Sequence, residues 1–119
     1  MKIAVTAMEG SEKGQLDTRF GRAAWFVVFD TDTEKYFSIP NEQNLNLPQG
    51  AGIQSAALVV NAGVKVLITS HCGPKAFSVL KKGGVEIFLA ADGTVAECID
   101  KYRKRLLRKT EEADVEGHW

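Results

Sequence analysis

Two short apolar runs constrain this chain more than any other feature. The first covers Ile3 to Met8, and the second covers Val64 to Thr69. Runs of this length that are rich in β-branched residues are typical of strands covered on both faces. We therefore expect a central sheet with helices packed against its faces.

Between these runs the sequence predicts an antiparallel hairpin. Trp25 to Phe29 is aromatic and β-branched, and Tyr36 to Ile39 is a second short strand, closed by Pro40. The link from Asp30 to Lys35 reads as a turn. Because this link is so short, the two strands must be antiparallel neighbours.

After Gly52 the chain alternates helical and strand patterns. A helix is predicted from Ile53 to a stop at Gly63, followed by the strand from Val64. A second helix is predicted from Pro74 to Gly83-Gly84, followed by a strand from Glu86 to Ala90. A last helix is capped by Thr94 and Glu97, and its apolar stripe runs through Tyr102 to Leu106. The order is β-β-β-α-β-α-β-α. Because β-α-β units require parallel strands, the predicted fold class is α/β, with a mixed five-stranded sheet flanked by helices.

Length and composition indicate one globular domain. The chain has 119 residues, of which 45% are hydrophobic. We expect a single α/β domain over residues 1–109 and an acidic, flexible tail over residues 110–119. No apolar run approaches the ~20 residues of a membrane helix, so no membrane association is expected. The N-terminus lacks a signal-peptide pattern, and with only two cysteines we expect a cytoplasmic protein with reduced thiols.

Several functional classes are disfavoured. The 15 basic and 15 acidic residues balance, which argues against a nucleic-acid partner. The chain holds no GxGxxG, no GxxxxGK[ST] and no GxSxG motif. The first strand carries none of the carboxylates that a two-metal nuclease needs. We therefore expect no enzymatic activity.

Three segments are expected to leave the same edge of the sheet, namely residues 17–24, 48–52 and 70–75. Two of them lead into helices, whose free N–H groups suit an anion. Glycines there would let a ligand approach the backbone, and cations would add charge. The candidate binding residues are Arg19, Phe20, Gly21, Arg22, Gly50, Ala51, Gly52, His71, Gly73 and Lys75. The alternative is that the glycines only make turns and the cations are solvated.

His71-Cys72 is the one place where an imidazole and a thiol adjoin. Thiolate favours copper(I), zinc and iron–sulfur species, so Cys72 is the candidate metal ligand. Two alternatives stay open. Cys72 could be a small buried residue beside a surface histidine, or the nucleophile of a thiol enzyme. Cys98 lies on the apolar stripe of the last helix and is predicted to be buried.

A strongly basic run ends the last predicted helix. It holds Lys101, Arg103, Lys104, Arg105, Arg108 and Lys109. These cations could form an ordinary solvated helix face. They could also form a docking patch for an acidic protein partner. The sequence does not indicate the oligomeric state.

Three motifs in order resemble the dinitrogenase iron–molybdenum cofactor biosynthesis family. They are Asp17-Thr18-Arg19-Phe20-Gly21-Arg22-Ala23, then Gly50-Ala51-Gly52-Ile53-Gln54-Ser55-Ala56, and finally Ala62 to Ile68 followed by Gly73-Pro74-Lys75-Ala76-Phe77 and Leu80. The resemblance runs from Met1 to about Tyr102. It implies a ribonuclease-H-like fold and noncovalent binding or carrying of molybdenum- or iron-containing sulfide clusters, without catalysis.

Within that family the chain resembles small stand-alone members, which implies a molybdenum–copper sulfide cluster. Such clusters are anions with soft sulfur surfaces, so the resemblance agrees with the anion-binding edge. An anion- or nucleotide-binding regulatory module that uses the same edge remains the alternative.

Overall fold

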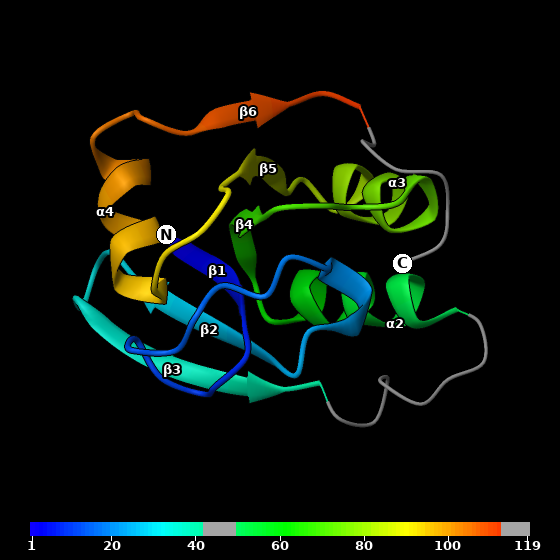
Figure 1. The fold of residues 1–119 in the computed structure, drawn as a ribbon. Coiled ribbons are helices and arrows are strands. Elements are labelled where there is room, and N and C mark those ends of the chain that lie inside the picture. Colours follow the sequence, from blue (N-terminus) through cyan, green and yellow to red (C-terminus); the bar gives the residue numbers. More distant parts are fainter. Residues whose placement is uncertain (42–49, 113–119) are drawn as a thin grey trace.

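A computed structural model describes residues 1–41 and 50–112. These residues form one mixed sheet of six strands in the order β3-β2-β1-β4-β5-β6 (Figure 1). The strands are β1 (Lys2–Ala7), β2 (Trp25–Asp30), β3 (Lys35–Pro40), β4 (Val64–Thr69), β5 (Glu86–Leu89) and β6 (Arg108–Thr110).

Strand directions place several loops at one edge of the sheet. β1 pairs with β4 and β4 with β5, both in parallel, whereas β2 runs antiparallel to β1 and β3. β6 runs antiparallel to β5, with Arg108 opposite Leu89. The ends of β1, β3, β4 and β5 and the start of β6 therefore lie at the same edge. This edge corresponds to the ligand-binding side of open α/β sheets.

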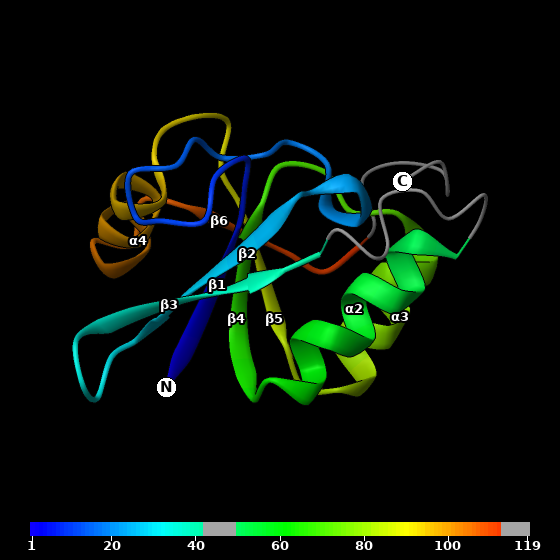
Figure 2. The same ribbon diagram turned by 90° about the horizontal axis from the view of Figure 1, so that it is seen from below.

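Helices cover both faces of the sheet. α2 (Ala51–Asn61) and α3 (Pro74–Lys82) lie on one face, and α4 (Val95–Arg103) lies on the other, as the views in Figures 1 and 2 show. Each face has its own apolar core. One includes Phe26, Val59 and Leu80 below α2 and α3, and the other includes Ile68 and Cys98 below α4.

Most of the predicted elements are confirmed, with shifted ends. The hairpin forms, Pro74 begins α3, and Thr94 and Glu97 make the predicted capping box. α2 begins at Ala51, two residues before the predicted start. Its buried face holds Ala51, Gly52, Ser55, Ala56 and Val59. Ile53, the first residue of the predicted pattern, is instead 38% exposed.

The prediction for the last helix is wrong at its C-terminal end. α4 stops at Arg103, and Leu106 is 68% exposed rather than part of the apolar stripe. The amide of Leu106 donates to the carbonyl of Lys101 at 2.9 Å, and that of Arg105 donates to Tyr102 at 3.0 Å, with Arg105 at a φ of 61°. These bonds form a Schellman cap, in which the left-handed residue is usually glycine. Because arginine occupies this position, the sequence carries no helix-stop signal.

The sheet has six strands rather than the predicted five, because residues 108–110 pair with β5 as β6. Lys109 also forms a 2.8 Å ion pair with Glu86 on β5. Thr110, placed in the predicted tail, is the last residue of β6, and residues 113–119 lie outside the described part of the chain. The tail and the ribonuclease-H-like assignment stay predictions. Over the described residues, no helix is long and apolar enough to cross a membrane.

Candidate anion-binding edge of the sheet

Backbone hydrogen bonds hold two of the predicted edge segments together. The amide of His71, just after β4, donates to the carbonyl of Thr18 at 3.0 Å, and the amide of Phe20 donates to the carbonyl of His71 at 3.1 Å. Arg19 and His71 are thus paired as in a parallel bridge. The prediction that these two segments leave the same edge of the sheet is confirmed, and the hydrogen bonds show in addition that they lie side by side.

Two buried hydroxyl groups support these loops from below. Thr6, near the end of β1, donates from its Oγ1 to the carbonyl of Asp17 at 2.7 Å. The same oxygen lies 3.0 Å from Oγ1 of Thr69, near the end of β4. Both threonines are fully buried. Because unpaired buried polar groups are costly, this contact fixes where the loop carrying Arg19 leaves the sheet.

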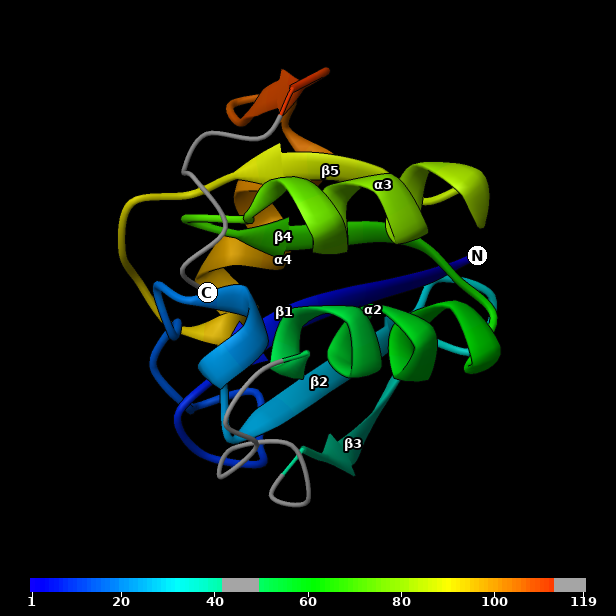
Figure 3. The same ribbon diagram turned by 90° about the vertical axis from the view of Figure 1, so that its right-hand side faces the viewer.

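The first loop continues into η1 (Phe20–Arg22), a single 3-10 turn that packs against α2. Figure 3 shows η1 beside the ends of α2 and α3 that face this edge. The Phe20 side chain is fully buried, with its ring centroid 5.4 Å from that of Phe26. Asn41, also buried, donates from Nδ2 to the carbonyl of Ala23 at 2.9 Å and to Oγ of Ser55 at 3.0 Å. These contacts fix η1 to α2.

α2 and α3 both begin at this edge, and among the described residues neither has a side-chain cap. Their N-cap residues are Gly50, with a φ of 82°, and Gly73. Neither helix has an acidic residue in its first turn. α4 differs, because Thr94 and Glu97 satisfy its first amides. The N-termini of α2 and α3 therefore leave N–H groups and a partial positive charge for an anion.

An open pocket of about 440 Å³ lies at the same edge. It is bounded by the loops after β4 and β5, by the first loop and by the start of β6. Its lining residues are Thr18, Ser70, His71, Leu89, Ala90, Ala91 and Arg108. Arg108 is not among the site residues predicted from the sequence. Only the pairing of β6 with β5 brings it there, and nothing in its local sequence indicates that pairing.

The other predicted residues occupy different positions along the edge. Arg19 and Lys75 are exposed and Arg22 is half-buried, whereas Gly21, Ala51, Gly52 and Gly73 are buried backbone positions next to the helix starts. Phe20 is part of the core, so its side chain positions the loop instead of reaching the surface. Of the predicted segment 48–52, Pro48 and Gln49 lie outside the described residues.

Both cysteines are unbridged and buried. Cys72 is 1% exposed and belongs to the core below α2 and α3, next to the exposed His71. Burial raises the pKa of the Cys98 thiol to about 11, which keeps it protonated at neutral pH. Over the described residues, no group of three or more His, Cys, Asp or Glu could hold a metal ion. Ligation by Cys72 would therefore require the loop after β4 to open.

The described residues form a small α/β domain whose candidate anion-binding edge combines two helix N-termini with several basic side chains. The chain belongs to the dinitrogenase iron–molybdenum cofactor family, whose model matches residues 1–105. It is also 32% identical over 113 residues to an uncharacterised protein of Methanocaldococcus jannaschii, covering 93% of this chain and 92% of that protein.

Two solved structures extend this comparison. The apo orange protein from Desulfovibrio gigas is 34% identical, with a TM-score of 0.92 over 96% of each chain. A putative NifB protein from Thermotoga is 28% identical, with a TM-score of 0.83 over 96% of this chain and 98% of that one. The family resemblance read from the three sequence motifs is confirmed. Membership connects the chain with metal-cluster binding or carrying in general.

Proposed function

We propose that this protein binds and carries an anionic metal–sulfide cluster that contains molybdenum, of molybdenum–copper or iron–molybdenum type, held noncovalently at the sheet edge. The main support is the pair of uncapped helix N-termini at Gly50 and Gly73, which lie at one edge of the sheet. Arg19, Lys75 and Arg108 add positive charge to this edge. An anion there would meet backbone N–H groups and guanidinium groups together.

The chemistry of the cargo fits this kind of edge. A thiomolybdate brings its own sulfur ligands, so the protein need not supply a complete metal coordination shell. Burial of Cys72 favours retention by charge and shape over a protein thiolate, and it also disfavours a thiol nucleophile. The proposal therefore includes no catalytic step. An anion- or nucleotide-binding module is the competing hypothesis, because phosphate groups use the same backbone donors.

The test is anaerobic reconstitution with tetrathiomolybdate, with and without copper(I), followed by gel filtration. We expect a coloured protein, with molybdenum, copper and sulfide retained in a fixed ratio. Parallel reconstitution with iron, sulfide and molybdate identifies the cluster type. Cys72→Ala should retain the colour, and loss of copper alone in this variant would assign the thiol as a ligand.

Matched charge variants test the location. Arg108→Gln should weaken tetrathiomolybdate binding by about threefold to tenfold at low salt, because an exposed charged contact contributes on the order of 1 kcal/mol. The effect should shrink as salt is raised. Lys104→Gln removes the same charge on the α4 side and should leave binding unchanged. Equal affinity in all three proteins, or displacement of the cluster by micromolar ATP, would contradict the proposal.

A further inference from the structure

The basic run from Lys101 to Lys109 is not one uniform charged face. Four of its six cations are engaged locally with carboxylates, as Lys101 with Asp92, Arg103 with Glu34, Lys104 with Asp100 and Lys109 with Glu86. Arg105 and Arg108 have no ion-pair partner among the residues that the structure describes. Each of these two arginines lines a pocket.

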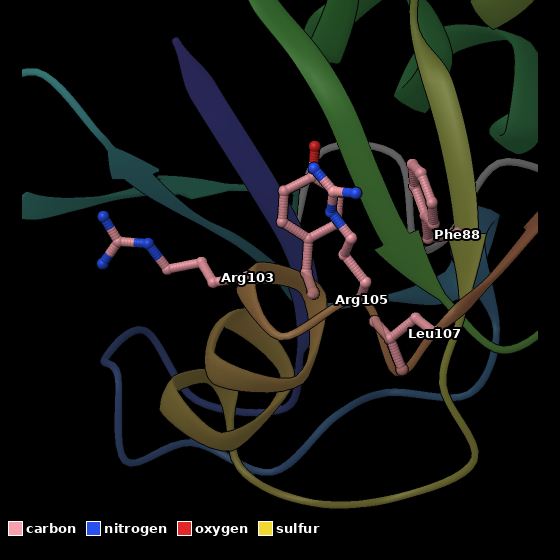
Figure 4. A pocket seen from close by; sticks show the side chains of 5 residues that line it. Phe88, Arg103, Arg105 and Leu107 are labelled. Atoms are coloured by element: carbon pink, nitrogen blue, oxygen red, sulfur yellow. The ribbon is translucent and has the colours of Figure 1, made fainter.

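The pocket beside Arg105 lies on the α4 side of the sheet. It measures about 400 Å³ and is lined by Phe88, Tyr102, Arg103, Arg105 and Leu107. The rings of Phe88 and Tyr102 meet edge-on, with centroids 4.9 Å apart. Figure 4 shows the Arg103 side chain extending away from the other labelled side chains, whereas the Arg105 side chain lies on the same side as those of Phe88 and Leu107. The pocket thus combines an apolar base with one available guanidinium group.

A further exposed apolar residue lies between two of the pocket residues in the sequence. Leu106 directly follows Arg105 and is 68% exposed. β6 is the last strand in the sheet order, so its outer edge has no strand partner within the described residues. Arginine, tyrosine and large apolar side chains around a small cavity are the composition of protein-interface anchors. A small molecule would leave Leu106 uncovered, so these features favour a protein segment.

We propose that this pocket is the docking site for an acidic segment of a partner protein, with one aromatic or large aliphatic side chain in the cavity and a carboxylate on Arg105. Charge complementarity selects this occupant, because Arg105 lacks a carboxylate partner within the described residues, whereas Arg103 and Lys104 beside it each have one. A guanidinium group can bind a carboxylate with two parallel hydrogen bonds.

The docking site and the candidate edge share one short segment. Leu107 lines the docking pocket, and Arg108, the next residue, lines the edge pocket. Leu107 directly precedes β6 and Arg108 is its first residue, so both pockets adjoin the start of this strand. A docked partner would therefore lie next to the cargo. That this partner delivers or receives a cluster rests on the proposed function, whereas the docking itself does not.

The test uses the apoprotein, so its result is independent of cluster binding. The probe is a synthetic octapeptide that alternates Asp or Glu with Phe or Leu, and the control peptide carries Lys at each acidic position. We expect the acidic peptide alone to cause saturable NMR shifts at Phe88, Tyr102, Arg105 and Leu107. No saturation up to about 5 mM, the range of weak peptide binding, would overturn the proposal. Equal shifts with the control peptide, or shifts confined to the α2–α3 edge, would also overturn it.

The backbone conformation at Arg105 allows a substitution that removes the side chain without straining the fold. Because Arg105 has a φ of 61°, Arg105→Gly removes the side chain at a position that glycine adopts without strain. We expect unchanged or higher thermal stability and binding weaker by about fivefold, as for a partly desolvated charged contact. Arg105→Asn, which also tolerates this conformation, should behave alike. Lys104→Gln should bind as the unmodified protein does. Full binding by Arg105→Gly and Arg105→Asn would refute the role of the guanidinium group.

Discussion

The contact between Thr6 and Thr69 allows a sharp test of how the edge is held. Thr6→Val replaces a hydroxyl by a methyl group of nearly the same shape, so the packing and the strand preference of β1 are kept. The substitution removes two contacts of Thr6 Oγ1. One is its hydrogen bond to the carbonyl oxygen of Asp17 at 2.7 Å, and the other is its contact with Oγ1 of Thr69 at 3.0 Å. Any decrease in the free energy of unfolding should therefore come from the lost polar contacts.

The expected cost follows from burial. Thr6 and Thr69 are fully buried, and leaving a buried polar group unpaired costs about 1–3 kcal/mol. We expect Thr6→Val to lower the free energy of unfolding by about 2 kcal/mol in urea titrations followed by circular dichroism. For a chain of this size that corresponds to a Tm lower by roughly 8 °C. The exposed Thr33, changed to Val, is the matched control and should alter the stability by less than about 0.5 kcal/mol.

A double-mutant cycle distinguishes this contact from general damage. Thr69→Val alone should also destabilise the protein, since Thr6 loses its hydroxyl neighbour. The double variant should cost less than the sum of the single changes by about 0.5–1.5 kcal/mol, because no unpaired hydroxyl remains. Additive costs, or a Thr6→Val protein as stable as the parent, would refute the assignment of the edge geometry to these hydroxyl groups.

Two further predictions concern packing and pH. A Cβ on Gly83 would lie 2.5 Å from Cγ2 of Val60, so Gly83→Ala should destabilise the α2–α3 interface by about 1–3 kcal/mol in urea titrations. Adding Val60→Ala should recover part of that loss, and no recovery would place the strain elsewhere. Burial raises the pKa of the Cys98 thiol to about 11, above that of an unfolded cysteine. The stability due to the neutral thiol is complete below about pH 8.5 and is lost as pH rises toward 11. Cys98→Ala should lack this alkaline decline, and an identical decline in both proteins would exclude the thiol as its source.

The sequence alone determined the parts of this protein that depend on local patterns. The apolar runs, the hairpin, the proline that begins α3 and the capping box of α4 are all read from neighbouring residues, and the structure confirms them. Burial of Cys98 followed from the spacing of the α4 stripe in the same way. The family was also accessible from the sequence, since its motifs are short and contiguous.

Only the tertiary structure decided the features that depend on distant partners. β6 has no apolar alternation and forms because β5 offers an unpaired edge, with Lys109 bound to Glu86. That pairing in turn brings Arg108 to the candidate edge and Leu107 to the pocket on the other face. The end of α4 was missed because an arginine occupies a left-handed position where glycine is the usual signal. Local sequence encodes strand and helix preferences. The ion pairs that leave Arg105 and Arg108 without a carboxylate partner within the described residues depend on side chains that come together only after the chain has folded.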